Sequence, residues 1–233
     1  MTNPKYTILI TLYKSGQFIE SKLLSLENQT TLDQAEIIFL NCQDHDKESI
    51  KINEFITKHP NSRQIIFAAH KHLYETWNIG ILETTGQYIT NYNADDQWHP
   101  KYLETCGSYL DTNQQTAIVT TGILITDLPN QVHPKWSHHD KMPTLEYPKS
   151  SAGPSPMWRR NLHDKHGLFG NYRVIGDARF WEKLHEAKET FGLIHEDLVL
   201  YYTSPESLER RRDNQGNSYI DLDLKDTKHR DTP

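Results

Sequence analysis

The 233-residue sequence lacks the features that mark several classes of protein. Its only two cysteines, Cys42 and Cys106, are far apart and fall in no metal-ligand spacing, which argues against a disulfide scaffold or a cysteine zinc site. The thirteen histidines show no H-x-x-x-H spacing. Two free thiols in a reducing compartment are therefore the simplest interpretation.

The chain also has no excess of basic residues and no long apolar run. Its formal net charge is -6, whereas a nucleic-acid-binding protein normally carries a basic face. No apolar stretch approaches the length of a membrane span, and the start "MTNPKYTILI" has no signal-type basic or apolar region. We expect a cytoplasmic protein with no nucleic-acid partner and no transmembrane segment.

The first half of the sequence alternates between two periodicities. Short β-branched and apolar runs alternate with longer segments whose apolar residues have helical spacing. This alternation predicts an α/β fold with a mostly parallel sheet and right-handed crossovers. The predicted strands are 6–12, 35–41, 63–69 and 87–93, and the predicted helices are 15–29, 47–59 and 73–85.

The pattern loosens after Pro100. Helices are predicted at 100–112 and 176–192, and strands at 117–126 and 197–203. The segment 127–157 has no clear periodicity, so we expect a loop that orders over a ligand. Residues 210–233 are charged and poor in apolar side chains, which predicts a polar tail or a linker to further domains.

Asp95 and Asp96 follow directly after the fourth predicted strand. In parallel sheets ligands bind outside the carboxyl ends of the strands, so this pair lies where a ligand is expected. Neighbouring carboxylates repel unless a cation compensates them, and Mg²⁺ or Mn²⁺ commonly binds one or two carboxylates plus substrate phosphates. The alternative is that one of them supports the start of the helix at Pro100.

Four segments together resemble glycosyltransferase family 2, over roughly residues 6–209. They are "TILITLYKSGQFIESKLLSLENQT", "ETWNIGILETTGQYITNYNADD", "GDARFW" and "SPESLERR". The resemblance implies a GT-A fold with a Rossmann-like, mostly parallel central sheet flanked by helices and a smaller acceptor-side region. It implies a nucleotide-sugar-binding half at 1–100 and an acceptor-binding half at 101–209.

The resemblance also implies a function. The expected enzyme is an inverting glycosyltransferase that uses a nucleotide-sugar donor, with a UDP-sugar favoured, and Mn²⁺ or Mg²⁺. The expected acceptor is a glycan or a lipid-linked sugar. The protein would then lie in the cytoplasm, either free or peripherally associated with the membrane where the acceptor is made.

Particular residues match the family's motifs. Asp96 matches the metal ligand and Asp177 the catalytic base, whose alternative role is an N-cap. The expected nucleotide-binding residues are Thr11, Tyr13, Asn41, Cys42, His72, Asn78 and Asp95. Tyr13 would flank the base and Asp95 the ribose, while Asn78 and Gly80 would lie on the helix behind the donor or simply pack there.

The sequence departs from the family at three places. Asn41-Cys42 replaces an acidic pair that reads uracil, so the base would be read by backbone groups, the Asn41 amide or Asp44, which is the next acid. Ala94 replaces the first acid of the D-x-D-type motif, and His72 stands where relatives often carry Arg. In the acceptor half, Trp158 and Trp181 could pack against a sugar face, with core packing as the alternative.

Two other classes of function compete with the enzyme. One is a non-catalytic nucleotide-sugar-binding module of a larger enzyme, which the retained Asp96 and Asp177 disfavour. The other is a nucleotidyltransferase, but "TLYKSG" does not supply the glycine-rich phosphate loop which that chemistry uses.

Overall fold

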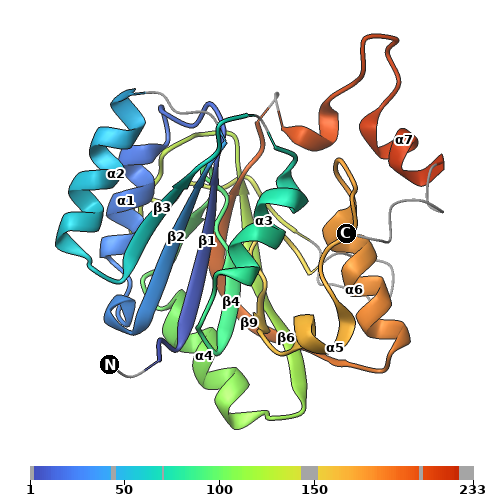
Figure 1. Ribbon diagram of the computed structural model, residues 1–233. Helices are drawn as coiled ribbons and strands as arrows, with labels where there is room; N and C mark the ends of the chain where they lie inside the picture. The colour runs from blue at the N-terminus through green and yellow to red at the C-terminus, as the bar shows by residue number, and fades with distance from the viewer. Residues whose placement is uncertain (1–2, 43–45, 70, 143–151, 205–206, 226–233) are drawn as a thin grey trace.

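A computed structural model describes residues 3–42, 46–69, 71–142, 152–204 and 207–225 (Figure 1). The strands are β1 Tyr6–Leu12, β2 Ala35–Asn41, β3 Ser62–Ile66, β4 Tyr88–Asn91, β5 Gln97–Trp98, β6 Thr116–Thr126, β7 Asp140–Lys141, β8 Met157–Arg159 and β9 Thr190–Tyr202. The helices are α1 Ile19–Glu27, α2 Asp46–Lys58, α3 Leu73–Leu82, α4 Tyr102–Thr112, α5 Leu162–His166, α6 Gly176–Glu186 and α7 Tyr219–Lys225. Two 3₁₀ turns are η1 Leu32–Gln34 and η2 Leu208–Arg210.

A single mixed sheet forms the centre of the described chain. Its order is β3-β2-β1-β4-β8-β6-β9-β5, with β7 paired to β6. β1 pairs in parallel with both β2 and β4, and β2 with β3, as the alternating pattern predicted. β8 runs antiparallel between β4 and β6, which joins this parallel half to the β6–β9 pair.

Hydrophobic side chains fill both faces of the sheet. Ile8 and Ile10 of β1 belong to a cluster that includes residues of α1, α2 and α4, whereas the intervening Leu9 belongs to a second cluster with residues of α3 and α6. This split follows from the two-residue period of a strand. At Gly80 an added Cβ would lie 2.9 Å from Leu9, so α3 approaches the sheet closely.

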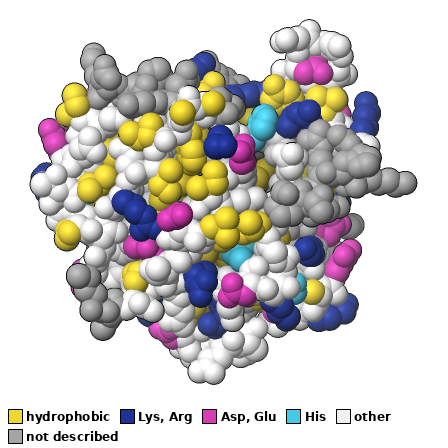
Figure 2. Space-filling view, viewed as in Figure 1, with side chains coloured by type: hydrophobic (Ala, Val, Ile, Leu, Met, Phe, Trp, Pro, Cys, Tyr) yellow, Lys and Arg dark blue, Asp and Glu magenta, His cyan; other side chains and the backbone are white. Residues whose placement is uncertain are grey.

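Some apolar side chains remain at the surface. Figure 2 shows hydrophobic side chains gathered over α3 and the strands beside it, and Ile66 and Leu82 are exposed by 52% and 71%. None of the helices in the described ranges is long and apolar enough to cross a membrane.

The predicted helix 176–192 is too long. α6 ends at Glu186, and Lys188 has φ +65°, a left-handed conformation that interrupts the helix. β9 then starts at Thr190, and its first part pairs in parallel with β6, so Phe191 and Gly192 are strand residues. The predicted strand 197–203 is only the second part of β9.

The predicted polar tail contains folded structure. Residues 219–225 form α7, and Asp223 on this helix has no exposed surface. The Asp223 carboxylate attaches α7 to the rest of the protein by accepting hydrogen bonds from backbone N–H groups of residues 173–175. A count of apolar residues cannot reveal such a polar contact, which is why the sequence pattern missed it.

Glu36 on β2 provides a test of this packing. Its buried carboxylate accepts hydrogen bonds from Thr7 Oγ1 at 2.6 Å, Thr85 N at 2.6 Å and Gly86 N at 2.8 Å, and Arg63 Nη1 lies at 3.2 Å. Burial alone would raise the pKa of Glu36, but these hydrogen bonds outweigh it and hold the pKa below its usual value.

We expect Glu36→Gln to lower the free energy of unfolding at pH 7 by roughly 2–3 kcal/mol, because the amide cannot satisfy the same donors. A depressed pKa stabilises the fold above the unfolded-state pKa of about 4.3 and ceases to do so as the pH falls through the folded-state value. Urea unfolding from pH 7 to pH 3 should therefore show the two proteins converging in acid. A difference in the free energy of unfolding that stays constant from pH 7 to pH 3 would contradict a stabilising role for the ionised Glu36 carboxylate.

Candidate functional site

The carboxyl ends of β1, β2 and β4 meet at one edge of the sheet, because these strands are parallel. Thr11 and Tyr13 lie at the end of β1 and are half-buried. The Tyr13 ring has cations beside it, with Lys14 Nζ at 5.3 Å and Arg211 Cζ at 5.9 Å from its centre. Arg211 comes from the C-terminal segment, so this segment reaches the end of β1.

Asp96, in the turn after β4, is completely buried. One carboxylate oxygen accepts a hydrogen bond from Asn93 Nδ2 at 3.0 Å, and the other accepts one from Tyr202 N at 3.2 Å. Asp96 therefore ties the turn after β4 to the end of β9.

A buried lysine lies beside the two carboxylates of this turn and offsets their negative charge. Lys22 of α1 is fully buried, donates a hydrogen bond to the main-chain carbonyl of Asp96, and lies 2.9 Å from the centre of the Tyr92 ring. Burial, then the charge of Asp95, raises the pKa of Asp96 well above its usual value, while Lys22 acts in the opposite direction. Burial lowers the pKa of Lys22, against the attraction of both carboxylates.

These contacts do not fit the expectation that Asp96 is the metal ligand. Its carboxylate has no exposed surface and is directed to Asn93 and Tyr202 inside the protein, so in this conformation it does not reach the edge of the sheet where the donor phosphates are expected. Asp95 is half-buried, and it is the member of the pair that retains access to the edge of the sheet.

The protein alone offers few ligands to a metal. In the described ranges no group of three or more His, Cys, Asp or Glu side chains could hold an ion. A single carboxylate still fits a divalent ion that takes its other ligands from substrate phosphates and water, as Mg²⁺ commonly does. A cation at Asp95 would therefore depend on the bound donor.

Asp177 is the second residue of α6 and is half-buried. Its Oδ1 accepts hydrogen bonds from the Tyr74 hydroxyl at 2.8 Å and from Ala178 N at 2.8 Å. The helix begins after Ile175, so Asp177 does not occupy the N-cap position. Burial raises the pKa of Asp177 above its usual value, although both hydrogen bonds oppose it, and a raised pKa suits a group that accepts protons.

Helix α3 connects the end of β1 with Asp177. Trp77 Nε1 donates a hydrogen bond to Thr11 Oγ1 at 3.0 Å, and Tyr74, one turn earlier, contacts Asp177. The rings of Tyr74 and Trp77 pack edge to face with their centres 5.3 Å apart. Thr11 and Asp177, which are far apart in sequence, thus both contact helix α3, at positions one turn apart.

Asn78 and Gly80 have packing roles, which was the alternative for both. The Asn78 side chain makes two hydrogen bonds with the backbone of Phe169, donating to its carbonyl at 2.8 Å and accepting from its N–H at 3.0 Å. Asn78 thereby attaches the 167–172 segment to α3.

Trp158 and Trp181 also lie in the core. Trp158 has no exposed surface and Trp181 only 2%, and their rings pack against each other and against Phe169. Trp158 Nε1 donates to His163 Nε2 at 2.9 Å. A ring without exposed surface offers no face to a sugar, so the expected acceptor contacts are wrong and core packing explains both residues.

The other residues that were predicted to bind the nucleotide differ in their exposure to solvent. Asn41 and Cys42, at the end of β2, are buried, and burial raises the pKa of the Cys42 thiol to about 11, so it stays neutral at physiological pH. Asp44, the alternative base-reading residue, lies outside the described residues. His72 is exposed and immediately precedes α3.

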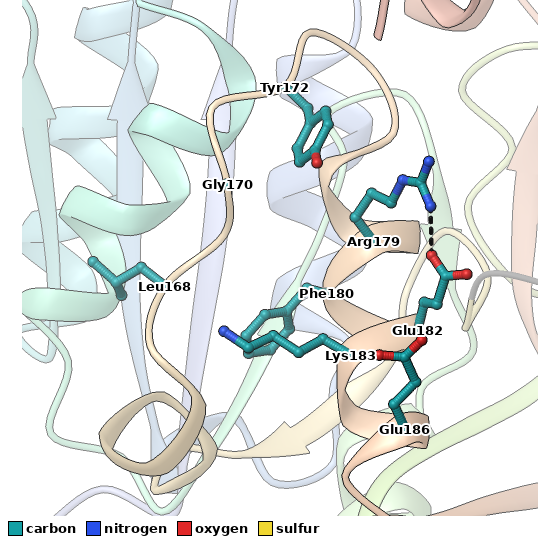
Figure 3. A pocket seen from close by; sticks show the side chains of 8 residues that line it. All are labelled: Leu168, Gly170, Tyr172, Arg179, Phe180, Glu182, Lys183 and Glu186. Carbon is teal, nitrogen blue, oxygen red and sulfur yellow. Dashed lines mark hydrogen bonds and ion pairs between the residues drawn. The ribbon is translucent and has the colours of Figure 1, made fainter. Parts of the chain in front are cut away.

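A pocket of about 400 Å³ opens beside α6 (Figure 3). Neither Asp177 nor Asp95 lines it, and an ion pair of 2.6 Å joins Arg179 to Glu182 at its rim. Its lining consists of Leu168, Gly170, Tyr172, Arg179, Phe180, Glu182, Lys183 and Glu186. The pocket is therefore separate from the candidate catalytic groups.

The segment predicted to order over a ligand, 127–157, is only partly within the described residues, which omit 143–151. In its first part Asn130 contacts α1, where Ser21 Oγ donates to Asn130 Oδ1 at 2.7 Å, and β7 pairs with β6. Its role as a lid stays a prediction.

Sequence reasoning missed two residues of this site, Lys22 and Tyr74. Lys22 had a detectable signal, because it lies at helical spacing between Ile19 and Leu26 on the apolar face of α1. Tyr74 had none, since its contact with Asp177 joins residues about a hundred positions apart.

Comparison with known proteins supplies independent findings. The model of the family described as "Glycosyl transferase family 2" matches residues 7–184. EpsH of Bacillus subtilis (strain 168), a candidate glycosyltransferase, is 33% identical over 223 residues, which cover 91% of this chain and 64% of EpsH. An uncharacterised glycosyltransferase of Haemophilus influenzae is 22% identical over 195 residues, covering 78% of this chain and 60% of that protein. The chain thus spans less than two thirds of the length of these curated relatives.

Solved structures share the fold. The crystal structure of S. aureus TarS 1–349 in complex with UDP-GlcNAc has a TM-score of 0.73 at 12% identity, covering 90% of this chain and 62% of that one. The mannosyltransferase PcManGT from Pyrobaculum calidifontis, in complex with GDP-Man and Mn²⁺, has a TM-score of 0.68 at 13% identity and covers 90% and 60%.

Proposed function

Because the chain belongs to glycosyl transferase family 2, we propose that it transfers a sugar from a nucleotide-diphosphate donor to a hydroxyl group of an acceptor. The resemblance inferred from the four sequence segments is thereby confirmed. The expected GT-A fold is confirmed as well, with its largely parallel first half and helices on both faces.

The geometry around Asp177 supports this proposal most strongly. In the proposed reaction the acceptor oxygen forms a bond to the anomeric carbon, the bond from that carbon to the diphosphate breaks in line, and Asp177 takes the hydroxyl proton. The Tyr74 hydroxyl is within reach of both Asp177 Oδ1 and the Val174 carbonyl. It can therefore donate to the carboxylate before transfer and to the carbonyl once Asp177 carries the proton.

The donor would lie at the carboxyl ends of β1 and β4, with Tyr13 beside the base and Asp95 toward the diphosphate. A divalent cation bound by Asp95 together with the phosphates would offset the negative charge of the leaving group. One structural neighbour is complexed with GDP-Man and Mn²⁺, which supports a cation of this kind.

We propose a UDP-sugar as the donor and a glycan or lipid-linked sugar as the acceptor. A structural neighbour in complex with UDP-GlcNAc supports the choice of uridine, whereas another binds GDP-Man, so both nucleotides belong in the test. The base would be read by Tyr13 and main-chain groups at the end of β2, since Asn41 and Cys42 are buried.

Sugar transfer by the unmodified chain tests the proposal. UDP-GlcNAc, UDP-glucose and GDP-mannose, each labelled in the sugar, would be incubated with the protein, Mn²⁺ and a panel of oligosaccharide and lipid-linked acceptors. We expect the label of one donor to appear in an acceptor product that is absent without protein. Donor binding with no transferred label would instead support the non-catalytic nucleotide-sugar-binding module.

A further inference from the structure

The C-terminal helix contacts the backbone immediately before Asp177. Figure 1 shows α7 beside the amino end of α6. Asp223 of α7 is completely buried, and its Oδ2 accepts hydrogen bonds from the N–H groups of Arg173 at 2.9 Å, Val174 at 2.8 Å and Ile175 at 3.3 Å. Its Oδ1 lies 3.5 Å from Arg173 Nη1.

Three successive N–H groups that converge on one carboxylate form an anion-binding nest, whose backbone conformation depends on the anion at its centre. Here the anion is a side chain of the protein itself. Hydrogen bonds to a charged acceptor contribute more than neutral ones, so the contact restrains residues 173–175. These residues lead directly into Gly176 and Asp177.

The peptide unit between Val174 and Ile175 also orients Tyr74. Its N–H, from Ile175, donates to Asp223, while its carbonyl, from Val174, accepts a hydrogen bond from the Tyr74 hydroxyl, which contacts Asp177. A displacement of this peptide unit would therefore move both the backbone before Asp177 and the hydroxyl that faces its carboxylate.

We propose that Asp223 is a positioning residue for sugar transfer, which holds Asp177 and Tyr74 in place through the backbone of residues 173–175. This inference rests on the proposed role of Asp177 as the base. The C-terminal segment also brings Arg211 to the ring of Tyr13. This segment therefore contacts both the part of the site where the nucleotide-sugar donor would lie and the backbone that leads to Asp177.

The test compares Asp223→Asn with Asp221→Asn, a matched control that removes an exposed carboxylate from the same helix. With UDP-GlcNAc or whichever donor of the panel is turned over, we expect Asp223→Asn to lower kcat about tenfold and to leave the affinity for the nucleotide diphosphate unchanged. Asp221→Asn should alter neither. Hydrogen exchange of the amides of residues 173–175 should accelerate only in the Asp223 variant.

A double mutant separates positioning from general support of the fold. If Asp223 acts through Asp177, the variant Asp177→Asn/Asp223→Asn should transfer sugar no more slowly than Asp177→Asn alone. A further tenfold loss in the double mutant, or a full kcat in Asp223→Asn despite faster exchange at 173–175, would overturn the proposal.

Each variant is assayed well below its melting temperature. If Asp223→Asn does not fold, Asp223→Glu takes its place, because it keeps the charge and displaces the carboxylate by one methylene; the same loss of kcat at unchanged nucleotide affinity is expected. Absence of transfer by the unmodified chain would overturn the proposed function and, with it, the positioning role. Unchanged exchange at 173–175 in Asp223→Asn would overturn the positioning role alone.

Discussion

Replacement of Asp177 by Asn is expected to lower sugar transfer by about a hundredfold or more, the usual scale for the loss of a general base. The amide is nearly isosteric with the carboxylate, and its oxygen can still accept hydrogen bonds from Tyr74 and Ala178. It cannot take a proton from the acceptor. The nucleotide affinity and the melting temperature should therefore change little, and kcat should carry the loss.

Asp221→Asn again serves as the control, because it removes a carboxylate of the same type from an exposed position. Transfer at more than half the normal rate in Asp177→Asn would show that another group is the base. A large fall in the melting temperature would instead assign Asp177 a structural role at the start of α6.

The second large effect is expected at Asp95. Asp95→Asn should abolish the part of nucleotide-diphosphate binding that depends on Mn²⁺ and lower transfer at least a hundredfold, because it removes the accessible carboxylate of the pair. Asp96→Asn should retain the metal dependence, since Asp96 faces Asn93 and Tyr202 inside the protein. Thermal denaturation with UDP, with and without Mn²⁺, measures both.

The reverse outcome would restore the assignment made from sequence. If Asp96→Asn loses the metal dependence and Asp95→Asn keeps it, the turn after β4 rearranges when the donor binds. We also expect Asp96→Asn to lower the stability of the protein without ligand, because Lys22 would lose the negative charge that compensates its own. This fall in stability is a second readout, which reports on the buried contact between Lys22 and Asp96.

The parallel part of the fold could be predicted because its determinants are local. β1, β2 and β4 are short buried runs rich in apolar and β-branched residues, and each intervening helix carries its apolar residues at helical spacing. β1 illustrates this, since Ile8 and Leu9 enter different clusters as the two-residue period requires. Asp177 was proposed as the base from its motif, and the structure adds the hydrogen bond with Tyr74.

The expectations that the structure does not support concern residues whose environment depends on distant parts of the chain. The assignment of metal binding to Asp96 could not take account of the Tyr202 N–H, which reaches its carboxylate from β9. Trp158 and Trp181 carry no local sign of whether a ring lies in the core or at the surface. Asp223 lies in a segment poor in apolar residues. Its partners are backbone N–H groups, which nearly every residue has, so the sequence does not reveal them.

Thermal denaturation of the unmodified chain with UDP, GDP and dTDP, each with and without Mn²⁺, tests the central claim most directly, because it requires no acceptor. A ligand that binds only the folded state, at about a hundred times its dissociation constant, stabilises a protein by about 2.7 kcal/mol, which is roughly 5–10 °C for a chain of this size. We predict such a rise with UDP and Mn²⁺ together and a much smaller one with either alone. No rise with any of the three nucleotides in the presence of Mn²⁺ would contradict a nucleotide-sugar site at the ends of β1 and β4.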